Sequence, residues 1–190
     1  MPDKSRIILA SASPRRQELL RKAGIEFVVR PADIPEVPLA DESPQVFAER
    51  MAREKALAVR DLSSHEAVLA ADTVVTVAGE ILGKPKDEHD AARMLRLLSG
   101  RKHLVISGVC LAGMTFEDVR SETTSVHFAA VSEEEIRDYV RGGEPMDKAG
   151  AYAIQGGASR FVTNVEGDYN NVVGLPVDLV LRMLREHGVL

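Results

Sequence analysis

The stretch VLAADTVVTV, residues 68–77, decides the fold, because it is apolar or β-branched throughout except for one charge, Asp72, near its centre. Such a run predicts a strand that is buried on both faces, as in a sheet covered by helices. A carboxylate in a buried strand lowers stability unless another group pairs with it. Residues 68–77 therefore predict a central strand and a partner for Asp72.

Strands and helices alternate on both sides of this run. Further strands are predicted at residues 26–30, 103–112, 119–131, 151–154 and 161–165, and helices at residues 43–59, 87–99, 132–141 and 176–187. The first three of these helices have Ser43, Asp87 and Ser132 as their predicted N-caps. The long run at 119–131 could pair antiparallel with 103–112. This order predicts an α/β fold with a mixed, twisted sheet flanked by helices.

The N-terminal segment LASASPRRQELL, residues 9–20, runs from an apolar strand directly into a helix. Ser13 is a suitable N-cap, and the proline after it has the fixed φ that suits the first helical position. The free N–H groups of the helix N-terminus would then lie beside Ser11, Arg15 and Arg16, an arrangement suited to binding phosphate. A capped helix with two solvated arginines fits the same residues, so the segment alone leaves both interpretations open.

Composition narrows the class of protein. The chain has 190 residues, 45% of them hydrophobic, and we expect a single domain over residues 1–190. The net charge of −5 argues against a general nucleic-acid binder, so cations gathered at one place must meet any anionic ligand. Cys110 is the only cysteine, which excludes a disulfide framework and favours a reducing, cytoplasmic location. No run of 18 uncharged apolar residues is present, so membrane insertion is not indicated.

Several polar residues stand at the ends or edges of the predicted elements and are candidates for chemistry. They are Ser11, Arg15, Arg16, Glu36, Lys55, Asp72, Lys84, Lys148 and Gln155. Each one alone also fits an ordinary surface role, and Asp72 is the exception because of its apolar flanks. The sequence has neither a GxxxxGK[ST] loop nor a GxGxxG motif, and it suggests no Ser-His-Asp or Cys-His arrangement for covalent catalysis.

Seven motifs, in order and in register, resemble the Maf family of nucleoside triphosphate pyrophosphatases over essentially the whole chain. Five of them are LASASPRRQELL (9–20), AREKA (52–56), AADTVV (70–75), GEILGKPKD (79–87) and LSG (98–100). Two more, DKAGAYAIQG (147–156) and GDYNNVVGLP (167–176), are similar to the branch that acts on dTTP and UTP, as distinct from the 7-methyl-GTP branch.

The resemblance implies hydrolysis of the α–β phosphoanhydride to a nucleoside monophosphate and pyrophosphate. It implies a fold similar to inosine triphosphate pyrophosphatase with a cleft between two lobes, a homodimer, and a divalent metal, usually Mg²⁺, with Mn²⁺ and Co²⁺ as alternatives. By position, the catalytic acid/base aspartate is Asp72; Glu36, Lys55 and Lys84 match other catalytic positions, Asp72 and Glu36 the metal ligands, and Ser11, Arg15, Arg16, Thr73 and Gln155 the substrate-binding positions.

The residue types suit this chemistry. Three cations, Arg16, Lys55 and Lys84, with a metal would neutralise a triphosphate, and a carboxylate such as Asp72 could accept a proton from a metal-activated water. Uracil and thymine present an N3–H donor beside carbonyl acceptors, which the Gln155 amide could meet with two hydrogen bonds.

Two other functions stay open at this point. One is a nucleotide-binding regulator of cell division or septum formation with little turnover. The other is the same hydrolysis on another base, including 7-methyl-GTP, against which the Gln155 region argues. A house-cleaning role toward modified nucleotides is a plausible purpose for the enzyme.

Overall fold

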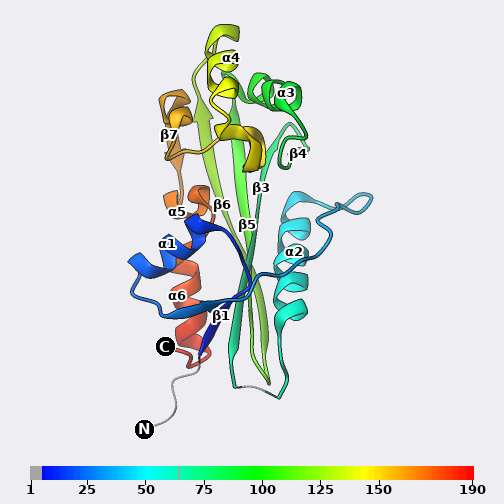
Figure 1. Ribbon diagram of the computed structural model, residues 1–190, viewed down its shortest axis with the longest axis vertical. Coiled ribbons are helices and arrows are strands. Elements are labelled where there is room, and N and C mark those ends of the chain that lie inside the picture. The colour runs from blue at the N-terminus through cyan, green and yellow to red at the C-terminus, as the bar shows by residue number, and fades with distance from the viewer. Residues whose placement is uncertain (1–5, 64) are drawn as a thin grey trace. The chain divides into compact units, whose positions relative to one another are not determined.

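The computed structural model describes residues 6–63 and 65–190, and its centre is one seven-stranded sheet (Figure 1). The strands follow the order β2-β1-β3-β5-β6-β7, and β4 pairs with β3. Their bounds are β1 Ile7–Leu9, β2 Phe27–Val29, β3 Ala67–Val77, β4 Glu80–Leu82, β5 Lys102–Ala112, β6 Glu117–Phe128 and β7 Val162–Glu166.

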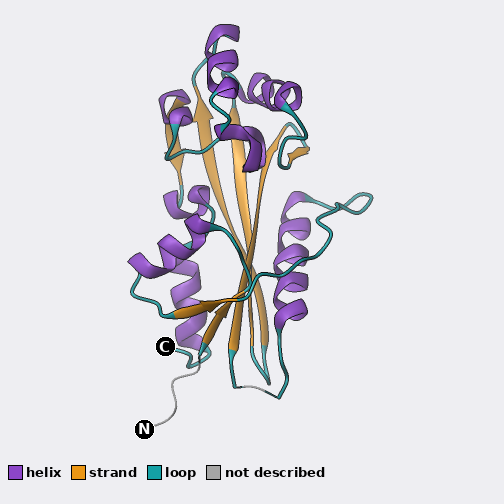
Figure 2. Cartoon of the chain, viewed as in Figure 1, coloured by secondary structure: helices purple, strands orange, loops and turns teal. Residues whose placement is uncertain are grey.

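The sheet is mixed, as predicted. β1 pairs in parallel with both β2 and β3, with Ile8 opposite Val28 and Val68. β4 runs antiparallel to β3, and β7 runs antiparallel to β6. Parallel pairs require crossover segments that cover the sheet, and the helices drawn in Figure 2 supply them.

Within the described residues there are six α-helices and three short 3₁₀ segments. They are α1 Pro14–Lys22, α2 Pro44–Val59, α3 Glu88–Leu98, α4 Glu133–Arg141, η1 Glu144–Asp147, η2 Ala149–Ala151, η3 Gly157–Phe161, α5 Tyr169–Val173 and α6 Val177–Glu186. Three of the predicted N-caps are confirmed, because the side chains of Ser43, Asp87 and Ser132 each accept a backbone N–H of the first turn. The side chain of Ser13 does not cap α1; instead, its own N–H donates to Ser11 Oγ at 3.2 Å.

The chain divides into two compact units. Unit 1 comprises Met1–Asp72, Ser107–Glu122 and Gly174–Leu190, and unit 2 comprises Thr73–Ile106 and Thr123–Val173. In the part of the chain that the structure describes, no helix combines the length and the apolar character needed to cross a bilayer.

In unit 1, helix α2 packs on one face of the strands, and α1 and α6 lie on the other (Figure 1). Ala52 and Ala56 of α2 share a buried cluster with residues of β1, β3 and β5, including Cys110. A Cβ at Gly108 would lie 2.2 Å from the carbonyl oxygen of Ala48, so only glycine lets β5 approach the helix this closely. Cys110 is fully buried, as predicted, and burial raises the pKa of its thiol to about 12.

Unit 2 has an aromatic core. The rings of His103, Phe128 and Tyr152 meet edge to face, with centroids 4.9 to 5.4 Å apart. His103 Nε2 and the Tyr152 hydroxyl form a buried hydrogen bond of 2.8 Å. This bond satisfies the Tyr152 hydroxyl and the Nε2 atom of His103 within the aromatic core.

The predicted strand at residues 151–154 is wrong. The segment is a 3₁₀ turn, η2, followed by an irregular turn, because Gly150 and Ala151 have φ values of +68° and +59°. Left-handed backbone at two successive residues cannot continue as a strand. The sequence reasoning also assigned no element to β4 or α5, which span three and five residues.

Candidate active site

Asp72 and Lys55, both in unit 1, form a buried ion pair. Asp72 lies in the middle of β3 and is 7% exposed, and Lys55 lies on the inner face of α2 and is 8% exposed. Lys55 Nζ donates to Asp72 Oδ1 at 2.6 Å. Buried charges are tolerated when they are paired, so this contact explains how an apolar strand accommodates a carboxylate. The sequence predicted that Asp72 has a partner, and the structure identifies that partner as Lys55.

Glu36 reaches the same ammonium from the loop that precedes α2. Its Oε1 lies 2.6 Å from Lys55 Nζ, although the Glu36 side chain is 45% exposed. Because both carboxylates contact one nitrogen, the contacting oxygens of Glu36 and Asp72 can be no further apart than twice that distance. One cation therefore holds two carboxylates from different parts of the chain side by side.

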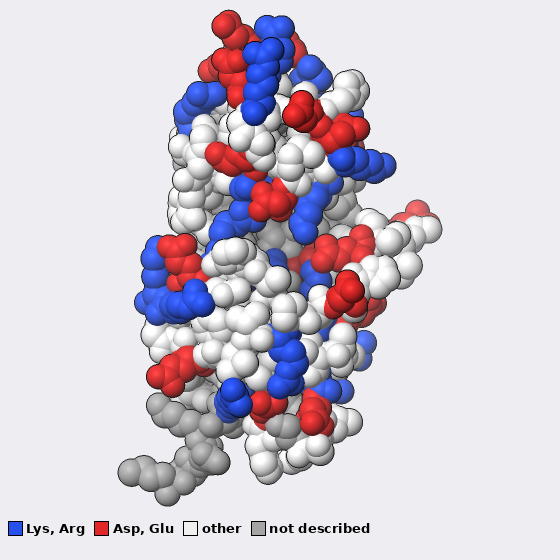
Figure 3. All heavy atoms as spheres, in the orientation of Figure 1, with Lys and Arg blue, Asp and Glu red and all other residues white. Residues whose placement is uncertain are grey.

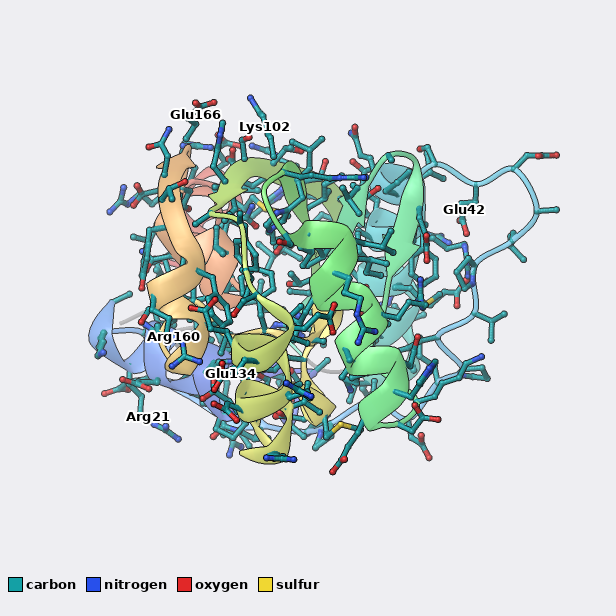
Figure 4. The ribbon with its side chains drawn as sticks, turned by 90° about the horizontal axis from the view of Figure 1, so that it is seen from above. Arg21, Glu42, Lys102, Glu134, Arg160 and Glu166 are labelled. Carbon is teal, nitrogen blue, oxygen red and sulfur yellow. The ribbon has the colours of Figure 1, made fainter. Side chains whose placement is uncertain are left out.

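Arg50 ties the loop that carries Glu36 to helix α2. Its guanidinium donates to both oxygens of Glu42, at 2.6 and 2.7 Å, and to the carbonyl oxygen of Val37 at 3.0 Å. Figure 4 shows Glu42 on this loop, beside the helix. Val37 follows Glu36 directly, so the bond to its carbonyl fixes the backbone next to the carboxylate that reaches Lys55. Sequence reasoning missed Arg50 and Glu42, and their only signal is opposite charge across the start of a helix.

Arg16 is held by backbone carbonyls next to the ion pair. Its Nε donates to the Gly174 oxygen at 2.8 Å, and its Nη1 donates to the Ala71 oxygen at 2.8 Å and to Ser11 Oγ at 3.3 Å. Ala71 immediately precedes Asp72. Charge-assisted bonds to backbone fix the guanidinium, and through it the Ser11 hydroxyl, beside the buried carboxylate.

The pKa of Arg16 reports how these charges interact. Burial lowers the pKa of its guanidinium, the negative charges of Asp72 and Glu36 oppose that shift, and the neighbouring charge of Arg15 adds to it. The two carboxylates and two arginines are thus close enough to influence one another.

We call Ser11, Arg16, Glu36, Lys55 and Asp72 the Asp72 cluster. All five were predicted site residues, and the structure brings them together from β3, α1, α2 and two loops of unit 1. On the face shown in Figure 3, basic and acidic side chains are intermixed.

Two carboxylates beside each other fit a magnesium ion in part. Mg²⁺ prefers oxygen ligands and is usually held by one or two carboxylates together with substrate phosphates and waters. Asp72 and Glu36 supply such a pair. Among the residues that the structure describes, no group of three or more His, Cys, Asp or Glu side chains could hold a metal ion, so the remaining ligands would have to come from substrate and water.

Three predicted site residues, Lys84, Thr73 and Gln155, belong to unit 2. Lys84 is exposed and follows β4, where the carbonyl of the preceding Gly83 accepts a 3.1 Å bond from Gly150 N–H. Thr73 follows Asp72 along β3, so by the pleat its side chain projects from the opposite face. Gln155 is exposed in the turn between η2 and η3. An approach of these side chains to the Asp72 cluster stays a prediction.

Comparison with known proteins places the chain. A family model described as Maf-like protein matches residues 6–187. A protein of Koribacter versatilis named dTTP/UTP pyrophosphatase is 58% identical over 184 residues, covering 97% of this chain and 95% of that protein. Proteins with the same name from Geobacter sulfurreducens and Symbiobacterium thermophilum are 51% and 50% identical, over 99% and 96% of this chain and 100% and 94% of theirs. With this agreement over almost its full length, the chain belongs to the Maf family.

Proposed function

We propose that this protein is a nucleoside triphosphate pyrophosphatase that hydrolyses dTTP and UTP to the nucleoside monophosphate and pyrophosphate. One structural observation carries the proposal: Asp72, buried in the central strand, shares the Lys55 ammonium with Glu36. The relatives named dTTP/UTP pyrophosphatase match the chain over nearly its full length and support the substrate class.

Asp72 and Glu36 are the proposed ligands of a divalent metal, Mg²⁺ or alternatively Mn²⁺ or Co²⁺. When bound, the metal would neutralise phosphate charge and make a coordinated water more acidic. The adjacent carboxylates support this role, because they are hard oxygen ligands that already lie next to each other.

The proposed reaction is the attack of a water oxygen on the α-phosphorus. Asp72, with Glu36, orients the water and its carboxylate accepts the water proton. A bond forms from the water oxygen to the α-phosphorus, and the bond from that phosphorus to the α–β bridging oxygen breaks, so pyrophosphate leaves. An aspartate is a weak base toward bulk water, which is why the step requires an acidified water.

The cations have the task of neutralising charge. Lys55 donates one hydrogen bond to Asp72 and forms an ion pair with Glu36, and its ammonium is also proposed to meet a phosphate oxygen. Arg16 is fixed by carbonyls and would present a preorganised positive charge. Arg15 and Ser11 at the start of α1, and Lys84 of unit 2, are proposed to contact the phosphates.

Arg15, Thr73 and Gln155 are proposed to select the nucleotide. The Gln155 amide can accept from N3–H and donate to a neighbouring carbonyl of uracil or thymine, and a pocket that tolerates the 5-methyl group would admit both substrates. We further propose a homodimer in the cytoplasm with a house-cleaning role toward modified nucleotides. Sedimentation of the purified protein tests the dimer, and a panel of canonical and modified triphosphates tests the role.

The decisive experiment is pyrophosphate release from dTTP and UTP, with Mg²⁺ and with a chelator. We expect turnover that the chelator abolishes, and a loss of roughly 10³-fold in kcat for Asp72→Asn, the usual scale for a general base. The side chain of Asn is the same size, so circular dichroism should show the variant folded. Tight nucleotide binding without turnover by the wild type would support the regulator instead, and near-normal turnover by Asp72→Asn would refute the assignment of Asp72.

A further inference from the structure

The segment that carries Gln155 is a tight turn, and its backbone is held on both sides of that residue. We call residues 153–157 the Gln155 turn. Gly156 N–H donates to the Ala153 carbonyl at 3.1 Å and closes the turn, while the Gln155 side chain is exposed. An exposed glutamine has many rotamers, so its aim depends on how firmly the backbone beneath it is fixed.

Two side chains outside the turn supply that fixing. The hydroxyl of Tyr139, on α4, accepts the N–H of Ala153 at 3.2 Å and donates to Glu144 Oε1 at 2.8 Å. The Glu144 carboxylate in turn accepts the N–H of Gly157, with its two oxygens at 3.0 and 3.1 Å. Tyr139 and Glu144 are hydrogen-bonded to each other, and they bond the backbone N–H groups two residues before and two residues after Gln155.

The Glu144 carboxylate packs directly against the turn. A Cβ at Gly156 would lie 2.0 Å from Glu144 Oε1, so a larger residue there would displace the carboxylate. Tyr139 is 6% exposed, and its ring packs edge to face with Phe161 at 5.7 Å. Burial, followed by the bond to Glu144, raises the pKa of the Tyr139 hydroxyl, so the group stays protonated and remains a donor.

We propose that Tyr139 and Glu144 are positioning residues that set base selectivity by fixing the backbone around Gln155. The inference rests on the proposed reading of the base by Gln155. Uracil presents N3–H as a donor, whereas cytosine presents N3 as an acceptor beside an amino group, so a glutamine amide that can turn over serves either base. A backbone held on both sides fixes the point and the direction in which the Gln155 side chain leaves the turn, so fewer of its rotamers bring the amide to the base. Selectivity for UTP over CTP follows from that restriction.

The test is the ratio of kcat/KM for UTP to kcat/KM for CTP in Tyr139→Phe and Glu144→Gln. Each change keeps the approximate size of the side chain. Tyr139→Phe removes the hydroxyl that bonds Ala153 N–H, and Glu144→Gln replaces the carboxylate that bonds Gly157 N–H with a neutral amide. We expect the ratio to fall at least about fivefold, the effect of one net hydrogen bond, with most of the change arising on CTP. Because the ratio compares two substrates on one enzyme, a partly unfolded preparation does not alter it. Glu134→Gln, an exposed residue of α4 labelled in Figure 4, is the matched control and should keep the wild-type ratio.

A double-mutant cycle separates positioning through Gln155 from a general structural role. Gln155→Ala should abolish the preference, and adding Tyr139→Phe to it should then change the ratio no further. A further fall in the double variant, or an unchanged ratio in both Tyr139→Phe and Glu144→Gln, would overturn the inference while leaving the proposed function intact. An unchanged ratio in Gln155→Ala itself would instead refute the reading of the base by Gln155 and the inference with it, and pyrophosphate release would still report on the hydrolase.

Discussion

The Asp72 cluster and the Gln155 turn are held together by different kinds of contact. In the cluster, charged side chains from a strand, two helices and a loop meet one another, with Lys55 at 2.6 Å from both Asp72 and Glu36. In the turn, irregular backbone is held through its N–H groups by the Tyr139 and Glu144 side chains. The first arrangement places charge, and the second places a neutral amide.

The difference follows from what each region is proposed to do. Stabilising a highly charged reaction requires preorganised charge in a poorly solvated place, and a central strand with a packed helix provides rigid support. Distinguishing similar bases requires an amide held at a fixed angle, for which hydrogen bonds to the backbone suffice. The cluster should therefore be costly to disrupt in stability, and the turn should be costly mainly in selectivity.

Removing the cation of the cluster is the harshest way to test this contrast. Lys55→Met leaves Asp72 buried without its partner, and we expect the free energy of unfolding to fall by about 3–5 kcal/mol in urea denaturation. Lys22→Met is the control, because Lys22 contacts Glu18 at the same 2.6 Å but both side chains are more than half exposed. That variant should lose less than about 0.5 kcal/mol. Similar losses in both would mean that burial does not govern the Asp72 pair.

Substitution of Gly150, which shortly precedes the Gln155 turn, should have the next largest effect on the unfolding free energy. Gly150 has a φ of +68°, and a Cβ there would lie 2.9 Å from three side-chain atoms of Val75. We expect Gly150→Ala to cost about 3 kcal/mol in unfolding free energy, combining a left-handed alanine with a clash against a stiff β-branched side chain. Gly143→Ala has a φ of +73° and open space around the Cβ, so it should cost about 1 kcal/mol. Equal costs would show that Val75 yields without strain.

Unit 2 contains a buried neutral imidazole, that of His103, whereas unit 1 contains a buried ion pair. The pH dependence of the unfolding free energy distinguishes the two. Burial, with a smaller contribution from His127, lowers the pKa of His103 to about 4. As the pH falls below about 6.5, the unfolded chain takes up this proton before the folded one does. Stability from His103 is therefore complete above pH 6.5 and is lost progressively toward pH 4.

The expected loss from His103 is about 2 kcal/mol between pH 7 and pH 5. In His103→Gln, the fall in unfolding free energy over that interval should be smaller by this amount, because the amide does not titrate and can still bond the Tyr152 hydroxyl. Urea denaturation of both proteins at the two pH values measures it. Parallel pH profiles would mean that His103 is protonated in the folded protein.

The regular part of the molecule could be predicted from sequence, because local patterns determine it. The apolar run at residues 68–77 predicted a buried strand, and its single charge predicted a paired carboxylate. The structure confirms the strand as β3 and the pairing as the bond from Lys55 to Asp72. The caps at Ser43, Asp87 and Ser132 were likewise readable from short motifs. Each of these signals lies within one or two turns of the element that it specifies.

Features that depend on distant contacts could not be predicted in this way. The short apolar stretch at residues 151–154 was predicted as a strand, but Gly150 and Ala151 have left-handed backbone. Val75, which a Cβ at Gly150 would meet at 2.9 Å, is far away in the sequence, so the local pattern does not reveal this contact. β4 exists through its pairing with β3. Tyr139 and Glu144 were not singled out, since nothing in their local sequence indicates that they bond the backbone of residues 153–157.

Arg50 gives the mildest test of the comparison, because it stabilises the Asp72 cluster by holding backbone, as Tyr139 and Glu144 hold the Gln155 turn. Its hydrogen bonds lower the pKa of Glu42 to about 2, so the Arg50–Glu42 pair stays charged at any assay pH near neutrality. Arg50→Met releases the loop at Val37 but leaves Lys55 and Asp72 in contact. We expect kcat/KM to fall about fivefold, as for loss of one positioning hydrogen bond. The unfolding free energy should fall as well, because the Glu42 side chain is only 5% exposed and loses its partner.

The control for Arg50 is Arg96→Met. Arg96, on α3, forms a bidentate pair with Glu133 of α4, and its removal should leave kcat/KM unchanged. If Glu36 is held mainly by Lys55, then Arg50→Met will behave like Arg96→Met, and the loop needs no second attachment. If Arg50→Met instead lowers kcat/KM while the ratio for UTP over CTP stays constant, then the effect belongs to the chemical step. That result would separate the two regions by function, since changes around the Gln155 turn should move the ratio and changes around Asp72 should not.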